Sequence, residues 1–139
     1  MIQTHATTLQ LIGKGVMLCG PSASGKSDLG IRLIENGALL VADDRTDLTL
    51  DNKKVLASAP KEISGQMEVR GIGIITLDIV VKTHLSIVVE LVNADAVKRY
   101  PAKKYIDFLG VTLPLIHLYA FEASAPAKIH RALIHHSHI

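Results

Sequence analysis

The chain has 139 residues, of which 48% are hydrophobic and 20% are charged, the composition of one soluble globular domain with a single core. Its formal net charge of +2 at pH 7 is too small to indicate nucleic acid or an anionic membrane surface as a partner. Apolar stretches such as LSIVVELV are far shorter than the roughly 20 residues that span a bilayer, and the N-terminus lacks a signal-peptide pattern. With one cysteine, Cys19, no internal disulfide can form, so a cytoplasmic protein is expected.

Short β-branched and apolar runs, separated by Gly, Pro, Asn and Asp, predict more strands than helices. Strands are expected at residues 7–12 and 16–19, around a Gly-Lys-Gly turn, and again within ALLVADD at residues 38–44. A helix is expected over residues 26–36, because apolar residues such as Leu29 and Leu33 recur at helical spacing. Gly37 then suits the left-handed residue that ends many helices.

The second half of the chain continues the pattern of short strands. TDLTL and KKVLAS are expected to form a hairpin around an Asp51-Asn52 turn, and strands are expected near residues 75–81, 85–92 and in PLIHLYAF. Residues 65–75 are punctuated by glycine, and residues 94–105 are polar. Ser124 can cap a last helix, and the terminal HHSHI is interpreted as its solvated end instead of a metal cluster. The expected fold class is α/β with a strand-rich mixed sheet.

The stretch GPSASGKSD fits the phosphate-loop pattern G-x-x-x-x-G-K-[S/T]. Its glycines let the backbone curl, so that successive N–H groups face phosphate oxygens, and the following helix adds the positive end of its dipole. Lys26 is expected to reach the β- and γ-phosphates, and Ser27 to bind Mg²⁺. An accidental turn is the alternative, but the strand before and the helix after provide the context that the motif requires. The predicted nucleotide-binding residues are Gly20, Pro21, Ser22, Ala23, Ser24, Gly25, Lys26 and Ser27.

Two carboxylates, Asp43 and Asp44, end the strand LLVADD. Ligands of open α/β sheets lie beyond the carboxyl ends of the strands, so these side chains are expected to face the phosphates. One can act as a base for an attacking hydroxyl, and the other can hold a metal ion. A solvated turn is the alternative, since Asp-Asp-Arg-Thr-Asp is also good turn chemistry.

Glu68 and Arg70 alternate with apolar residues in MEVRGIGII, so both can point to one side of a strand. A carboxylate that binds a metal ion and an arginine that stabilises the negative charge of the phosphoryl group would explain the pair. A surface ion pair is the alternative. Cys19, in the strand before the phosphate loop, is interpreted as a packing residue.

Together, GPSASGKSD, LVADDRTD and EVRGIGII resemble the bacterial HPr kinase/phosphorylase family. The resemblance implies a single phosphate-loop kinase domain over residues 1–139, similar to the family's C-terminal catalytic domain. It also implies that ATP and Mg²⁺ serve to phosphorylate a serine of HPr, or of a nitrogen-branch paralogue of this phosphocarrier. Full-length members form homo-oligomers, so a homo-oligomer is one state open to this chain.

The resemblance also assigns roles to single residues. Asp44 matches the family's proton acceptor, and Glu68 matches a metal ligand that acts together with Ser27, with Asp43 as a further candidate ligand. His5 occupies the position of the family's active-site histidine. Arg70 lies within the family signature, and Arg99, in VKRYP, matches a further catalytic arginine.

The chain departs from the family in three places. It begins where the catalytic domain begins, as in a short form without the family's N-terminal domain, and Pro21 stands where relatives often carry an acidic residue. The arginine-rich loop that the family associates with dephosphorylation is expected after PLIHLYAF, where this chain reads EASAPAK. The resemblance therefore does not extend to the reverse phosphorylase activity. Two other functions remain open: a small-metabolite kinase, and a nucleotide-responsive regulatory module that transfers no phosphate.

Overall fold

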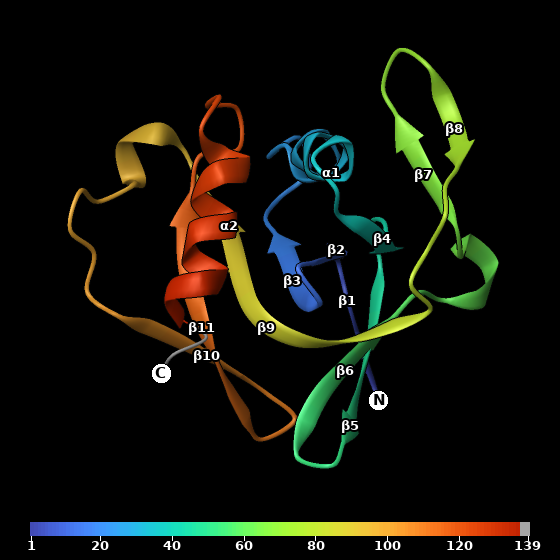
Figure 1. Ribbon diagram of the computed structural model, residues 1–139, viewed down its shortest axis with the longest axis horizontal. Helices are drawn as coiled ribbons and strands as arrows, with labels where there is room; N and C mark the ends of the chain where they lie inside the picture. Colours follow the sequence, from blue (N-terminus) through green and yellow to red (C-terminus); the bar gives the residue numbers. More distant parts are fainter. Residues whose placement is uncertain (137–139) are drawn as a thin grey trace.

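The computed structural model describes residues 1–136 (Figure 1), so positions 137–139, the last part of HHSHI and of the expected domain, lie outside the described residues. The strands are β1 (Ile2–Thr4), β2 (Ala6–Leu11), β3 (Lys14–Cys19), β4 (Leu39–Ala42), β5 (Thr46–Asp51), β6 (Lys54–Ser58), β7 (Gln66–Val69), β8 (Gly73–Thr76), β9 (Lys82–Leu91), β10 (Lys104–Phe108) and β11 (Val111–Leu118). The helices are α1 (Lys26–Glu35) and α2 (Ala125–His136), with short 3₁₀ turns η1 (Lys61–Ile63) and η2 (Ala94–Ala96).

Within residues 1–136, nine strands form one sheet in the order β1-β5-β6-β9-β3-β2-β4, with β11 and then β10 added beside β9. β3 and β11 both pair with β9 in parallel. β4 runs in the same direction as β3, because both are antiparallel to β2. The carboxyl ends of β3, β4, β9 and β11 therefore lie at one edge of a strand-rich mixed sheet, which confirms the expected fold class.

The long strand β9 joins the two parts of this sheet. Its first residues pair with β6, and its later residues lie between β3 and β11. Figure 1 shows β9 curving between the β5–β6 hairpin and the strands beneath the helices. The β7–β8 hairpin is a separate two-stranded sheet that projects beside α1 (Figure 1).

Both helices pack on one face of the sheet. One buried cluster contains residues of both helices and of the strands, such as Leu18. Its helical members include Leu29 and Leu33 of α1 and Ile129 and Leu133 of α2. A second cluster lies on the opposite face, where residues of β3, β5, β6 and β9 pack together with β10 and β11. As predicted, α1 ends at a left-handed glycine: Gly37 has φ 104°, and its N–H donates to the Ile34 carbonyl at 3.0 Å.

Three local predictions were wrong. The polar segment 94–105 leads into an additional strand, β10, which pairs with β11 and contributes Ile106 and Phe108 to the second cluster. The strand expected at residues 75–81 ends at Thr76, because it pairs with β7 as a hairpin. The β5–β6 turn is centred on Asn52 and Lys53, both with positive φ, while Asp51 remains paired with Lys54. No helix within residues 1–136 combines the length and hydrophobicity needed to cross a bilayer.

The packing of α1 makes a prediction about stability. Leu29→Ala is expected to lower the free energy of unfolding by about 2–5 kcal/mol, because Leu29 is fully buried and its removal leaves a cavity. Leu50→Ala is the matched control, since Leu50 is 56% exposed and is expected to change stability by no more than about 0.5 kcal/mol. Urea denaturation measures both, and equal losses would contradict the packing described.

Candidate active site

The phosphate loop connects β3 to α1 at the carboxyl edge of the sheet. Gly25 precedes the helix with φ 99°, and a methyl group added to it would lie 2.7 Å from Ala120 Cβ. Only glycine therefore fits there, for both conformation and space. Within the loop, the Ser24 N–H donates to the Pro21 carbonyl at 3.1 Å, which closes a tight turn. The local structure is thus the one that the sequence motif predicts.

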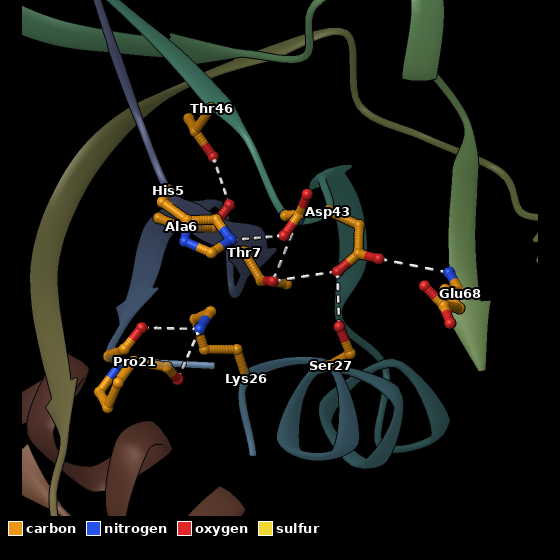
Figure 2. Close-up of polar contacts among 11 residues, drawn as sticks. His5, Ala6, Thr7, Pro21, Lys26, Ser27, Asp43, Thr46 and Glu68 are labelled. Carbon is orange, nitrogen blue, oxygen red and sulfur yellow. Dashed lines mark hydrogen bonds and ion pairs between the residues drawn. The ribbon is translucent and has the colours of Figure 1, made fainter. Parts of the chain in front are cut away.

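Lys26 folds its side chain back over this loop. The Nζ atom donates to the carbonyl oxygens of Gly20 at 2.7 Å and Pro21 at 3.0 Å (Figure 2). The residue is only 8% exposed, so these carbonyls replace much of the water that a lysine ammonium normally binds. The ammonium is therefore already held at the mouth of the loop.

Asp43 is the centre of the polar contacts in Figure 2. Its Oδ1 accepts hydrogen bonds from the hydroxyls of Thr7, at 3.0 Å, and Ser27, at 2.9 Å. Its Oδ2 accepts a longer one, at 3.3 Å, from the backbone N–H of Glu68. Asp43 is 6% exposed, and these donors satisfy the carboxylate in place of water. One side chain thus links β2, the start of α1 and β7.

Asp44 points in a different direction from Asp43. Its φ of 69° is in the left-handed region, which aspartate tolerates better than most residues, and its N–H donates to Thr7 Oγ1 at 3.4 Å. The Oδ1 atom lies 2.6 Å from His5 Nε2, close enough for the ring N–H to donate a hydrogen bond. The side chains of His5 and Asp44 are 55% and 61% exposed. This pair therefore faces solvent beside the phosphate loop.

The structure brings most of the predicted site residues together, but not all of them. The hydrogen bonds around the loop involve His5, Lys26, Ser27, Asp43, Asp44 and the backbone of Glu68. Arg70 is exposed at the tip of the β7–β8 hairpin, and Arg99 lies with its guanidinium 5.5 Å from the centre of the Tyr100 ring. Within residues 1–136, neither arginine forms a hydrogen bond or ion pair with the other predicted residues.

Thr7 is a site residue that the sequence did not indicate. It is fully buried, donates to Asp43 and accepts the Asp44 N–H, so it orients both carboxylates. A threonine in a strand of β-branched residues gives no signal of such a role, because threonine is common in strands for packing reasons alone.

A metal ion at this site would need ligands from outside the protein. Within the described part of the chain, no three His, Cys, Asp or Glu side chains gather closely enough to form a metal site by themselves. Asp43 accepts hydrogen bonds from both the Ser27 hydroxyl and the Glu68 backbone N–H, as Figure 2 shows, so these three residues are neighbours. Few protein oxygens, completed by water and substrate phosphates, are the arrangement that Mg²⁺ usually adopts with nucleotides.

A hollow of about 320 Å³ lies at the other end of the strands. It lies near the amino ends of β3 and β9, and its lining includes Gln10, Asp51, Lys82 and His84. It is thus separated from the phosphate loop by the length of β3, and it contains none of the predicted site residues.

Cys19 immediately precedes the phosphate loop and packs against the second core cluster. Burial, and secondarily the carboxylate of Glu90 beside it in register on β9, raise the pKa of the Cys19 thiol from 9.0 to about 11, while Lys26 acts in the opposite direction. The thiol therefore stays protonated at neutral pH. This fits the interpretation of Cys19 as a packing residue.

The chain belongs to a known class of phosphate-loop folds and, more narrowly, to one family. A strand, the GPSASGKS loop and a helix at the carboxyl edge of a mixed sheet define a phosphate-loop α/β domain. The sequence profile of the "HPr Serine kinase C-terminal domain" matches residues 1–137. The chain therefore belongs to the HPr serine kinase C-terminal domain family, and the expected resemblance is confirmed.

Individual relatives agree with this assignment. The chain is 32% identical over 135 residues to the HPr kinase/phosphorylase of Lactobacillus delbrueckii subsp. bulgaricus, covering 91% of the chain and 42% of that relative. It is 34% identical over 123 residues to the HPr kinase/phosphorylase of Malacoplasma penetrans, covering 79% and 40%. The chain thus spans about two fifths of the length of these curated relatives.

A solved structure of the Hpr(Ser) kinase/phosphatase from Coxiella burnetii matches the fold. The TM-score is 0.87 at 26% sequence identity, and the match covers 99% of this chain and 97% of that one.

The contacts of the two adjacent carboxylates predict different roles in stability. Asp43→Asn is expected to lower the free energy of unfolding by about 1.5–3 kcal/mol, because hydrogen bonds to a buried charge are lost or weakened. Asp44→Asn, at an exposed position, is expected to change it by no more than about 0.5 kcal/mol. Urea denaturation of both variants tests this, and a larger loss for Asp44→Asn would refute the assignment.

The raised pKa of Cys19 predicts slow alkylation. At pH 8.5 iodoacetamide is expected to react with the folded protein roughly tenfold or more slowly than with free cysteine, and the rate should keep rising towards pH 11. Glu90→Gln removes one cause of the shift and is expected to speed the reaction. Protein unfolded in urea serves as the control. A rate that levels off near pH 9 in the folded protein would contradict the shift.

Proposed function

We propose that this chain is the catalytic domain of an ATP- and Mg²⁺-dependent serine kinase that phosphorylates an HPr-like phosphocarrier protein. The observation that carries the proposal is the pairing of Asp44 with His5, at 2.6 Å, beside a phosphate loop that contains Lys26. Phosphoryl transfer to a hydroxyl requires a general base and a phosphate-binding loop. Membership of the HPr serine kinase family supports the choice of acceptor.

In this proposal Lys26 exchanges partners when a nucleotide binds. The ammonium now donates to two loop carbonyls, and anionic phosphate oxygens are stronger acceptors for it. Because Lys26 is largely buried, its charge is little screened there, and it would stabilise the γ-phosphoryl group as negative charge develops.

The Mg²⁺ ion would be held by Ser27, with Glu68 and Asp43 as carboxylate ligands. When bound, the ion would neutralise charge on the phosphate oxygens. Asp43 already fixes the Ser27 hydroxyl and the Glu68 backbone, so it orders the groups that would hold the ion.

Asp44 would act as the general base. As the acceptor serine oxygen forms its bond to the γ-phosphorus, the bond from phosphorus to the β,γ-bridging oxygen breaks and the serine proton passes to Asp44. His5 would hold Asp44 in place through its Oδ1, which leaves Oδ2 to receive the proton. Both side chains are exposed, so the serine of a folded protein can reach them.

The two arginines are proposed to supply further positive charge. Arg70 would approach the phosphates by movement of the β7–β8 hairpin, which lies next to the proposed ligand Glu68. Arg99 would approach from the segment after β9, whose carboxyl end lies at the same edge as the phosphate loop. Each would stabilise the charge on the transferred phosphoryl group.

We further propose that residues 1–139 act as one catalytic domain in the cytoplasm. The forward reaction is the proposed activity, since the EASAPAK loop lacks the arginines that the family resemblance associates with dephosphorylation.

The test is the intact mass of HPr, and of its nitrogen-branch paralogue, after incubation with the protein and Mg-ATP. The proposal predicts one added phosphoryl group on a carrier serine, and roughly a hundredfold or greater loss of rate in Asp44→Asn. Asp47→Asn is the matched control, since within residues 1–136 the Asp47 side chain accepts a hydrogen bond only from Gln3, on the neighbouring strand β1. Binding of Mg-ATP without transfer to either carrier would reject the kinase and favour a regulatory module.

A further inference from the structure

An exposed aromatic ring lies against the phosphate loop. Phe121 follows β11 and is 53% exposed. A methyl group built on Gly25 would lie 2.9 Å from Phe121 Cζ, so the ring touches the loop at the residue that precedes α1. The eight nucleotide-binding residues predicted from the sequence do not include this aromatic, because it lies almost one hundred positions further along the chain.

The position of this ring is fixed from both helices. Arg32 of α1 donates to the backbone carbonyls of Ala120 and Glu122, on either side of Phe121. Lys128 of α2 forms an ion pair with the Glu122 side chain at 2.6 Å. The segment after β11 is therefore anchored at its backbone, while about half of the Phe121 surface remains exposed to solvent.

A second aromatic residue sets the orientation of the ring. Tyr119 and Phe121 form an edge-to-face pair with their centroids 5.7 Å apart and their planes at 70°. Such a pair restricts the tilt of both rings. An exposed phenyl ring that is already held in one orientation loses little conformational entropy when a flat ligand stacks on it.

The location of Phe121 matches the path that a nucleotide would take. β11 and β3 are both parallel to β9, so the loop after β11 and the phosphate loop lie at the same edge of the sheet. When phosphates occupy the loop, the nucleoside extends from it along this edge. A ring whose Cζ and Cε1 atoms lie against Gly25 is then within reach of the base.

We propose that the ring of Phe121 is the stacking platform for the base of the bound nucleotide. This inference rests on the proposed nucleotide binding and adds the part of the site that recognises the base. The ligand class is a purine nucleoside triphosphate, since a purine offers the larger area for stacking. Base–aromatic stacking uses the flat face that every base has.

The test compares a ligand that has a base with one that has only phosphates. Isothermal titration calorimetry of the full chain with Mg-ATP and with Mg-tripolyphosphate gives both affinities for each variant. Phe121→Ala is expected to weaken ATP binding roughly 5- to 100-fold and to leave tripolyphosphate binding within about twofold. Phe121→Trp, which restores an aromatic face, is expected to retain ATP binding.

Two further variants separate stacking from structural effects. Phe121→Leu keeps an apolar side chain beside Gly25 but has no aromatic face, so it is expected to behave like Phe121→Ala. Tyr105→Ala is the matched control, because Tyr105 is 52% exposed on β10, and it is expected to bind both ligands like the wild type. Thermal melting verifies that each variant is folded.

The outcomes distinguish this inference from the proposed function. Wild type that binds both ligands, with ATP affinity unchanged in Phe121→Ala and Phe121→Leu, would overturn the platform and leave nucleotide binding intact. Equal loss of ATP and tripolyphosphate binding would also overturn it, by showing that Phe121 only supports the loop. Wild type that binds neither ligand would overturn both proposals.

Discussion

The arrangement of the site depends on one buried carboxylate. Asp43 accepts hydrogen bonds from Thr7, Ser27 and the backbone of Glu68, and thereby ties three separate segments together at the carboxyl edge of the sheet. A charge at 6% exposure is stable only with such partners, so the segments and the carboxylate constrain one another. The positive φ of the next residue then turns Asp44 away from this cluster towards His5. Adjacent aspartates thus have different environments, and this allows different chemical roles.

The topology explains why distant segments meet at this edge. β3, β9 and β11 are parallel, and β4 shares their direction through its pairing with β2. The phosphate loop follows β3, the two aspartates follow β4, Arg99 follows β9 and Phe121 follows β11. Local sequence supplies each loop, but only the sheet register places the loops beside one another.

The open character of the site has a consequence for catalysis. Asp44 and His5 are more than half exposed, so water screens the interaction between them in the free protein. A protein acceptor that covers this surface would exclude water and strengthen the same interactions. The proposed phosphocarrier acceptor would therefore complete the site as it binds.

The sequence predicted those features that depend on local chemistry. The loop GPSASGKSD, the helix after it and its end at Gly37 follow from short-range conformational rules, and the structure confirms them. The strand β10 was missed because its sequence, KYIDF, is partly polar and is stabilised by pairing with β11. Thr7 and Phe121 could not be assigned, because their positions beside Asp43 and Gly25 depend on long-range packing. Arg70 was predicted from its spacing with Glu68 and from the resemblance, and Arg99 from the resemblance; within residues 1–136 neither forms a hydrogen bond or ion pair with the other predicted site residues.

The most direct test of this account is a crystal structure of the chain with Mg²⁺ and a non-hydrolysable ATP analogue. The account predicts that Lys26 Nζ leaves the carbonyls of Gly20 and Pro21 and binds the phosphates, with the Ser27 hydroxyl on the metal ion. Asp43 is expected to remain bonded to Thr7, and Asp44 to remain beside His5. A nucleotide bound elsewhere, with Lys26 still on the loop carbonyls, would contradict the account.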